Sequence, residues 1–193
     1  SCLRNQLADT LYVFTDERQR IFDRHGESPI TMNPIQLDEN LRNSSQIVAG
    51  IADLALEPPI ARNGPGDEIE WIDVGLEDAV AEADGQVEAL MDAGWNAGQV
   101  ALLTTGSRHP EQKNIVESEG IAAYWDQFFA EEDVFYGHVL GFKGLERPAV
   151  VLCLNGFRDP QRASDMLYVG MSRATTKLIV VGDLTIFDEI YGN

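Results

Sequence analysis

Three short and almost uninterrupted apolar runs constrain the fold of this chain more than any other feature. They are QVALLTT at 99–105, AVVLCL at 149–154 and KLIVVGD at 177–183. Strands that are apolar on both faces are typical of a parallel sheet covered by helices on both sides. A helical pattern with a Ser-Asp start, SDMLYVGMSRAT at 164–175, separates the last two runs. This alternation predicts an α/β domain.

Neighbouring segments extend the same alternation. We expect further strands at LYVFTD (11–16), EIEWIDV (68–74) and VFYGHVL (134–140). Helices are expected after Asn43-Ser44-Ser45, over 76–90, and over 109–120, where Gly120 would end the helix. Ligands of parallel α/β sheets collect beyond the carboxyl ends of the strands, so polar site residues are expected there.

The charge is strongly negative but unevenly spread. The 193-residue chain carries a net charge of −18, and ten carboxylates with no Lys or Arg lie between Asn63 and Ser107. Nucleic acids need Lys and Arg for their phosphates, so this stretch is expected to be a solvated face. Because the rest of the chain is only mildly acidic, a local basic groove remains compatible with the composition.

The absence of several sequence features leads to expectations about where the protein resides and whether it uses a metal or covalent catalysis. There is no apolar run of membrane-spanning length and no signal peptide, and Cys153 lies inside an apolar run, so we expect a cytoplasmic protein with a reduced core thiol. The three histidines show no metal-ligand spacing, and no GxSxG motif supports a Ser/His/Asp site. We therefore expect neither a metal site nor covalent catalysis.

The chain contains neither a GxxxxGK[ST] phosphate loop nor a GxGxxG motif, so by itself it lacks a complete nucleotide cradle. It does carry cations and an amide near expected strand ends, which suit binding of a polyphosphate. Arg173 is the most informative of them, because it follows a helix and precedes a strand. It either caps that helix or reaches outward to an anion, and its residue type alone leaves both open.

Four segments, in chain order, resemble motifs of superfamily 1 DNA helicases of the UvrD/Rep type. FTDERQRIF (14–22) resembles motif III and QLDENLRNSSQI (36–47) motif IV. GFKGLERPAVVLCLNGF (141–157) is similar to motif V and LYVGMSRATTKLIVVGD (167–183) to motif VI. The resemblance implies a RecA-like parallel sheet without its own phosphate loop. Residues 1–30 would end a preceding RecA-like domain, and 31–193 would form the second one.

The resemblance also implies an ATP site shared between two domains. Arg173 and Arg42 match arginines that contact the γ-phosphate, and Gln19 matches the motif III glutamine that helps to place the attacking water. The phosphate loop and the Mg²⁺ ligands would lie on the first domain, within a longer parent protein. Further nucleotide-facing positions would be Glu146 at the ribose, Lys143 and Gly144 in its turn, Asp16 beside Gln19, and Leu41 where the family has an adenine-stacking Tyr.

The positions expected to face DNA depart from the family pattern. His138 and Leu140 replace the motif V Thr and His, and Arg24, followed by His25, stands where the family has a base-stacking aromatic residue. A guanidinium can also stack on a base. We therefore interpret the chain as the C-terminal motor domain of an ATP-dependent helicase or translocase on single-stranded DNA, inactive by itself. The alternatives are a degenerate helicase-like interaction module and, ranked last, an unrelated nucleotide-binding domain such as a dehydrogenase.

Overall fold

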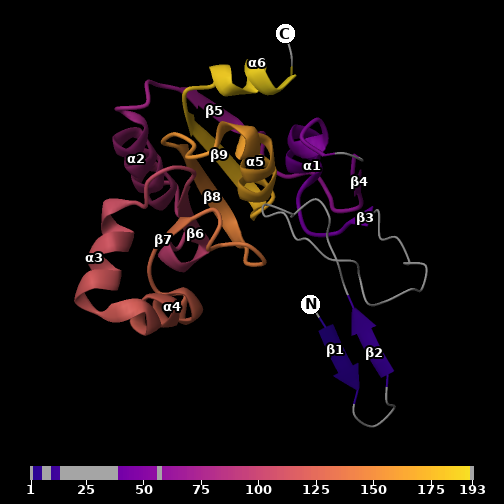
Figure 1. The fold of residues 1–193 in the computed structure, drawn as a ribbon, viewed down its shortest axis with the longest axis horizontal. Helices are drawn as coiled ribbons and strands as arrows, with labels where there is room; N and C mark the ends of the chain where they lie inside the picture. The colour runs from indigo at the N-terminus through magenta and orange to yellow at the C-terminus, as the bar shows by residue number, and fades with distance from the viewer. Residues whose placement is uncertain (1, 6–9, 14–38, 56–57, 192–193) are drawn as a thin grey trace.

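A parallel β-sheet forms the centre of the molecule (Figure 1), in a computed structural model that describes residues 2–5, 10–13, 39–55 and 58–191. Its strands stand in the order β5-β9-β8-β6-β7, and every neighbouring pair is parallel. The predicted parallel α/β sheet is thereby confirmed, and it is consistent with a RecA-like domain. The strands are β5 (Glu70–Asp73), β6 (Val100–Thr104), β7 (Phe135–His138), β8 (Arg147–Leu154) and β9 (Ala174–Gly182).

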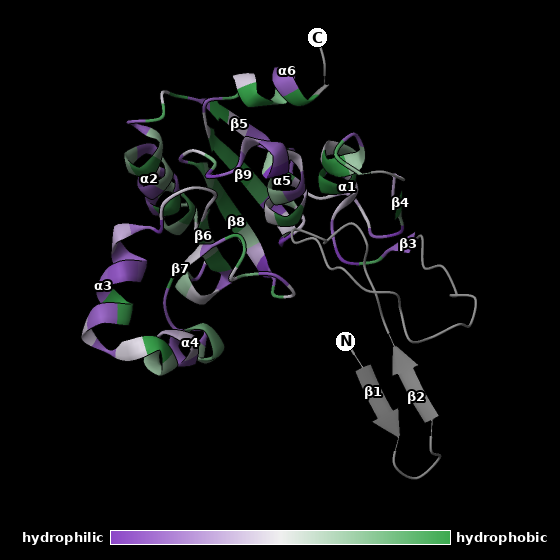
Figure 2. Ribbon diagram, viewed as in Figure 1, coloured by the Kyte–Doolittle hydropathy of each residue, from purple (hydrophilic) through white to green (hydrophobic). Residues whose placement is uncertain are grey.

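The three apolar runs form the central strands because both of their faces are covered. Along β8, Val150 and Leu152 pack into one core with α1 (Ser45–Ala52), α4 (Gly120–Ala130), α5 (Ala163–Met171) and α6 (Thr185–Tyr191). The alternate residues Val151 and Cys153 pack into a second core with α2 (Ala79–Asp92). Figure 2 shows these strands as a hydrophobic layer between helices whose outer faces are largely polar.

The helices include two that the sequence analysis did not expect, α4 and α6. Gly120 does follow the end of α3 (Pro110–Ser118) with a φ of +91°, as a terminating glycine should, but α4 begins at the same residue. In α4, Tyr124 and Phe128 face the core. No helix in the described part of the chain is long and apolar enough to cross a bilayer.

The predicted strand at 11–16 is found in part. β2 (Thr10–Val13) forms an antiparallel pair with β1 (Cys2–Asn5), so it belongs to a separate two-stranded sheet. A second small sheet pairs β3 (Glu39–Asn40) with β4 (Ile60–Ala61), in parallel, and α1 lies between these two strands in sequence. The predicted domain boundary at residues 30 and 31 lies outside the described residues.

Cys153 behaves as the predicted core thiol. It is fully buried in β8, and its Sγ lies 3.4 Å from the carbonyl oxygen of Ala79 in α2. Burial raises the pKa of the Cys153 thiol to about 12. The thiol is therefore protonated at neutral pH and acts as a small apolar side chain.

Gly98 allows the turn before β6 to touch the end of α4. A Cβ built at this position would lie 1.7 Å from the carbonyl oxygen of Glu131, which is far inside van der Waals contact. We expect Gly98→Ala to lower the free energy of unfolding by about 1 to 3 kcal/mol, because the two backbones must move apart. Urea unfolding measures this change.

The matched control is Gly85→Ala in α2, where an added Cβ meets nothing within 4 Å. It should be neutral or stabilising by up to about 1 kcal/mol, because Ala favours a helix. Equal effects of the two substitutions would contradict the close contact at Gly98.

Candidate functional site

The site is built where the central strands β8 and β9 begin. Glu146 directly precedes β8, and Arg173 directly precedes β9. The backbone N–H of Arg147 donates to the carbonyl oxygen of Arg173 at 3.1 Å, so these two chain segments lie side by side. Because parallel strands start at the same edge of a sheet, two residues far apart in sequence meet there. We call this end of the sheet, where the strands begin and Glu146, Arg173 and the nearby Arg42 lie, the amino-edge site.

Asn43 joins a third segment, the start of α1, to this edge. Its side chain is 1% exposed, and its Nδ2 donates to the carbonyl oxygens of Ser172, at 3.0 Å, and Ala174. The Oδ1 of Asn43 accepts a hydrogen bond from Asn40 Nδ2 at 2.8 Å. Asn43 therefore fixes the chain that carries Arg42 against the beginning of β9. The sequence predicted Asn43 only as part of a helix start, and this second role was not expected.

Arg42 and Glu146 form an exposed ion pair. Arg42 Nε lies 2.8 Å from Glu146 Oε2, and the two side chains are 41% and 52% exposed. The backbone N–H groups of Arg42 and Asn43 both donate to Asn40 Oδ1, which shapes the turn before α1. An exposed ion pair contributes about 0 to 1 kcal/mol. A bound anion or a hydroxyl group can therefore replace either partner at small cost.

The Arg173 side chain takes the capping alternative in this structure. Its side chain is 0% exposed, and its Nε donates to the carbonyl oxygen of Val169, one turn back in α5, at 2.9 Å. Two further bonds run from Nη1 to the carbonyl oxygen of Leu145 at 3.2 Å and from Nη2 to Ser172 Oγ at 2.8 Å. In this structure Arg173 caps α5, as cations at helix carboxyl ends do, and ties it to the turn that holds Glu146.

The turn that precedes Glu146 has a backbone conformation that requires its glycine, Gly144. Gly144 has a φ of +87°, a conformation that favours glycine, and the N–H of Leu145 donates to the carbonyl oxygen of Phe142 at 3.0 Å. Lys143 is exposed in the same turn. Leu41, next to Arg42, is 73% exposed, so an apolar surface adjoins the ion pair. The remaining predicted residues, Asp16, Gln19, Arg24 and His25, lie outside the described residues.

His138 lies at the opposite end of the strands, where it is the last residue of β7. β8 alone has eight residues, which spans roughly 25 Å at about 3.3 Å per residue. His138 is therefore well separated from Arg42, Glu146 and Arg173 among the described residues. The general expectation that polar site residues gather at the carboxyl ends holds for His138 but not for Arg42, Glu146 and Arg173.

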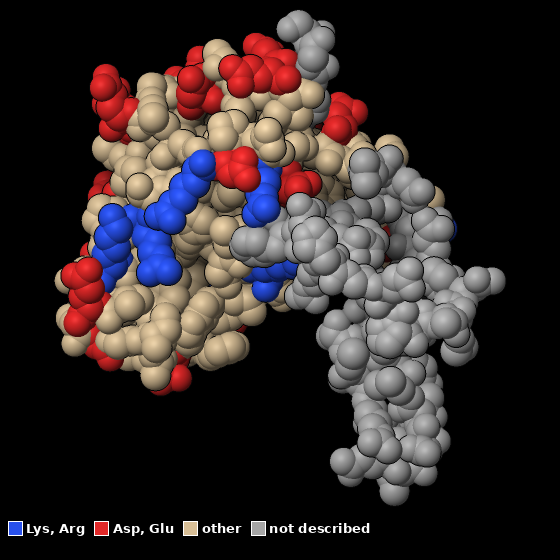
Figure 3. Space-filling view, viewed as in Figure 1, with Lys and Arg blue, Asp and Glu red and all other residues tan. Residues whose placement is uncertain are grey.

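A basic hollow of about 450 Å³ surrounds His138. Exposed Arg108, Lys113 and Arg158 line it together with Trp125. Figure 3 shows a cluster of Lys and Arg side chains on this face, with Asp and Glu side chains around it, many of them at the upper edge near α6 and others at the left and lower edges. The three cations were not among the residues predicted from the sequence. The available signal was that Arg108 follows the end of β6 and Arg158 the end of β8.

His138 is held in its neutral form. The N–H of Leu140 donates to Nδ1 at 3.2 Å, so the proton resides on Nε2, which lies 3.2 Å from the carbonyl oxygen of Gly106. Burial lowers the pKa of His138, and the charges of Arg108 and Arg158 lower it further against the opposing effect of its backbone hydrogen bonds. A neutral imidazole can hydrogen-bond or stack on a base but adds no charge to the hollow.

This lowered pKa makes stability depend on pH. The folded pKa lies below the ordinary value of about 6.5, so the unfolded chain binds the proton first as pH falls. The His138 contribution is therefore complete above pH ~6.5 and is lost below it. Because the ring is only partly buried, we expect well under the roughly 1.4 kcal/mol that corresponds to a tenfold change in proton affinity.

Urea unfolding at several pH values between about 8 and 5 tests this pH dependence. The His138→Gln variant should lose less stability than the wild type across this range. Equal losses in the two proteins would contradict a lowered His138 pKa.

The described residues contain no group of three or more His, Cys, Asp or Glu side chains that could hold a metal ion. Comparison with solved structures finds a likeness to the crystal structure of the C-terminal domain of a possible DNA helicase from Lactobacillus plantarum WCFS1, with a TM-score of 0.49 and 17% sequence identity. The match covers 75% of this chain and 88% of that one, and it concerns the fold alone. Neither a protein-family model nor a curated protein matches the chain.

Proposed function

We propose that this chain is the C-terminal motor domain of an ATP-dependent helicase or translocase that acts on single-stranded DNA. The observation that carries the proposal is the meeting of Arg42, Glu146 and Arg173 at the amino-edge site. These residues come from three segments that resemble motifs IV, V and VI, and they meet through an ion pair of 2.8 Å and a bond from Arg173 to the carbonyl oxygen of Leu145. Three matching positions from distant parts of the sequence are expected to converge if they serve one ligand.

In this proposal ATP binds Arg42 and Glu146 and replaces the ion pair that these two residues form with each other. The exposed Arg42 guanidinium offers paired N–H donors to a phosphate group, and the Glu146 carboxylate can accept hydrogen bonds from the ribose hydroxyls. Leu41 offers an apolar surface to the base. Gln19 and Asp16 would act from the motif III segment, and a separate RecA-like domain would supply the phosphate loop and the Mg²⁺ ligands.

Arg173 can act on a phosphate only after it exchanges partners. Its Nη1 would leave the carbonyl oxygen of Leu145, which belongs to the turn that carries Glu146. Binding of a ribose at Glu146 would move that same turn, so we propose that nucleotide binding releases Arg173 towards the γ-phosphate. A planar cation placed there stabilises the charge of phosphoryl transfer.

The basic hollow is the proposed binding site for single-stranded DNA. Arg108, Lys113 and Arg158 can contact backbone phosphates, while Trp125 and His138 offer rings for stacking. The hollow lies beyond the carboxyl ends of β6, β7 and β8, whereas the amino-edge site lies where β8 and β9 begin. A shift of the sheet against the neighbouring domain during ATP binding would therefore move both ends together.

The burial of Arg173 favours a second candidate, a helicase-like interaction module that does not hydrolyse ATP. A capping arginine with hydrogen bonds to Val169, Leu145 and Ser172 stabilises the domain whether or not nucleotide binds. The test that separates the two candidates is ATP hydrolysis by a protein in which this chain is joined to a phosphate-loop domain, with and without single-stranded DNA. DNA-stimulated hydrolysis supports the motor, and no hydrolysis supports the module.

A further inference from the structure

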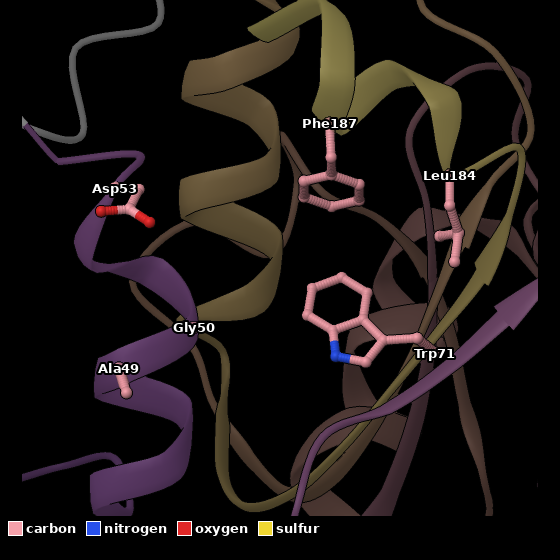
Figure 4. Close-up of a pocket in the computed structure, with 6 residues that line it drawn as sticks. All are labelled: Ala49, Gly50, Asp53, Trp71, Leu184 and Phe187. Carbon is pink, nitrogen blue, oxygen red and sulfur yellow. The ribbon is translucent and has the colours of Figure 1, made fainter. Parts of the chain in front are cut away.

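A separate apolar pocket of about 360 Å³ lies at the β5 edge of the sheet, away from both sites described above. It is bounded by α1, β5 and α6, as Figure 4 shows. Trp71 and Phe187 form one wall, with ring centroids 5.1 Å apart and planes at 87°. Leu184 completes that wall, and Asp53, at the end of α1, lines the opposite side of the pocket.

Two polar groups of this pocket lack partners within the described residues. Trp71 is 43% exposed on a strand, and its indole N–H makes no hydrogen bond there. The Asp53 carboxylate is exposed and likewise has neither a hydrogen bond nor an ion pair in the described part of the chain. An exposed tryptophan face with a carboxylate opposite combines a π surface that attracts cations with a full negative charge.

Acidic residues prevail around the pocket, and the nearby cation Lys177 is paired with Glu70 and Asp67. Residues 43–61, 63–107 and 178–193, which include all three lining elements, contain no Lys or Arg. Asp73 accepts a hydrogen bond from the N–H of Leu184 at 3.1 Å, and Asp183 accepts from Thr185, which places both carboxylates beside the pocket. α6 adds Asp188 and Glu189. The red upper edge in Figure 3 lies over this part of the molecule.

We propose that this pocket binds a Lys or Arg side chain of a basic peptide segment of a partner protein. The aliphatic part of such a side chain would lie on Trp71 and Leu184, and its cation would face Asp53. The acidic rim would attract the neighbouring basic residues of the segment. A second copy of this chain fits less well, because its net charge of −18 would repel the same rim.

The test uses the 193-residue chain and the peptide fluoresceinyl-Gly-Lys-Gly-Lys-Gly-Lys-Gly-amide, which carries the label on its N-terminal amine so that every Lys side chain stays free. The salt concentration is about 0.15 M to screen long-range attraction. We expect saturable binding by fluorescence anisotropy. Trp71→Ala, Asp53→Asn and Ala49→Trp should each weaken it about ten-fold or more, the last because a large side chain on exposed Ala49 fills the pocket.

Two matched control variants distinguish binding in the pocket from general attraction of the peptide to the net charge of the protein. Asp92→Asn removes an equally exposed carboxylate from the end of α2, and Phe129→Ala removes an aromatic ring that is 71% exposed on α4. Both should bind within about two-fold of the wild type. In ¹⁵N spectra, the indole signal of Trp71, assigned by its loss in Trp71→Phe, should shift more than those of Trp95 and Trp125.

Three results would overturn the proposal. Equal affinity across the pocket and control variants would mean attraction to net charge only. Absence of saturable binding by the folded wild type would exclude a basic peptide. A Trp71 signal that shifts with protein concentration alone would assign the pocket to a second copy. Circular dichroism of each variant verifies that it is folded, and none of these results depends on ATP hydrolysis.

Discussion

Replacing Asn43 with Ala should lower the free energy of unfolding by about 2 to 5 kcal/mol. The substitution removes the donor of two buried carbonyl oxygens, those of Ser172 and Ala174, and each unpaired buried acceptor costs roughly 1 to 3 kcal/mol. No other residue of the α1 start is positioned to replace both bonds in the described structure. Urea unfolding monitored by circular dichroism measures the loss.

The matched control is Asn63→Ala. Asn63 Nδ2 also donates to a backbone carbonyl oxygen, that of Arg42 at 3.3 Å, but this bond is exposed. Water can replace it, so the expected loss is within about 0.5 kcal/mol. If Asn43→Ala proved as mild as Asn63→Ala, α1 would not depend on Asn43 for its attachment to β9. The amino-edge site would then be far less fixed than the hydrogen bonds indicate.

The central sheet was predictable because each of its central strands is a short apolar run that can be recognised in the sequence. The runs at 99–105, 149–154 and 177–183 became β6, β8 and β9, and burial on both faces explains their uniform apolarity. The segment 120–130 was missed although Tyr124, Trp125 and Phe128 stand at helical spacing, because Gly120 was interpreted only as the end of the preceding helix. All three rings contact other rings of the core. α6 is short, and little in its sequence sets it apart from a loop.

The environment of Arg173 could not be predicted from its neighbours in sequence. Its hydrogen bonds to Val169 and Ser172 are local and match the capping alternative. The bond to Leu145, 28 residues earlier, depends on β8 and β9 starting at the same edge. Asn43 was missed for a similar reason, since its partners lie 129 and 131 residues away. Local patterns do not specify such pairings, which follow from the sheet order.

Arg42→Ala should lower ATP hydrolysis by roughly a hundredfold to a thousandfold in a protein that joins this chain to a phosphate-loop domain. Removal of one preorganised donor from a developing negative charge typically has an effect of about this size. Arg42 is a sharper probe than Arg173, because it is exposed and its loss breaks only an exposed ion pair with Glu146. Arg173→Ala removes a buried helix cap and is expected to destabilise the fold itself.

Arg62→Ala is the matched control. Arg62 is also exposed, and its Nε lies 2.8 Å from Glu39 in an ion pair of the neighbouring small sheet. The same loss of charge close to Arg42, but outside the amino-edge site, should leave hydrolysis within about two-fold of the wild type. A comparable fall in both variants would indicate a general electrostatic effect and not a phosphate contact.

The most direct measurement is therefore the rate of ATP hydrolysis by that joined protein, with and without single-stranded DNA, for the wild type, Arg42→Ala and Arg62→Ala. The motor account predicts that DNA stimulates the wild type and Arg62→Ala, and that Arg42→Ala stays at least about a hundredfold below them. Hydrolysis that neither responds to DNA nor depends on Arg42 would contradict it.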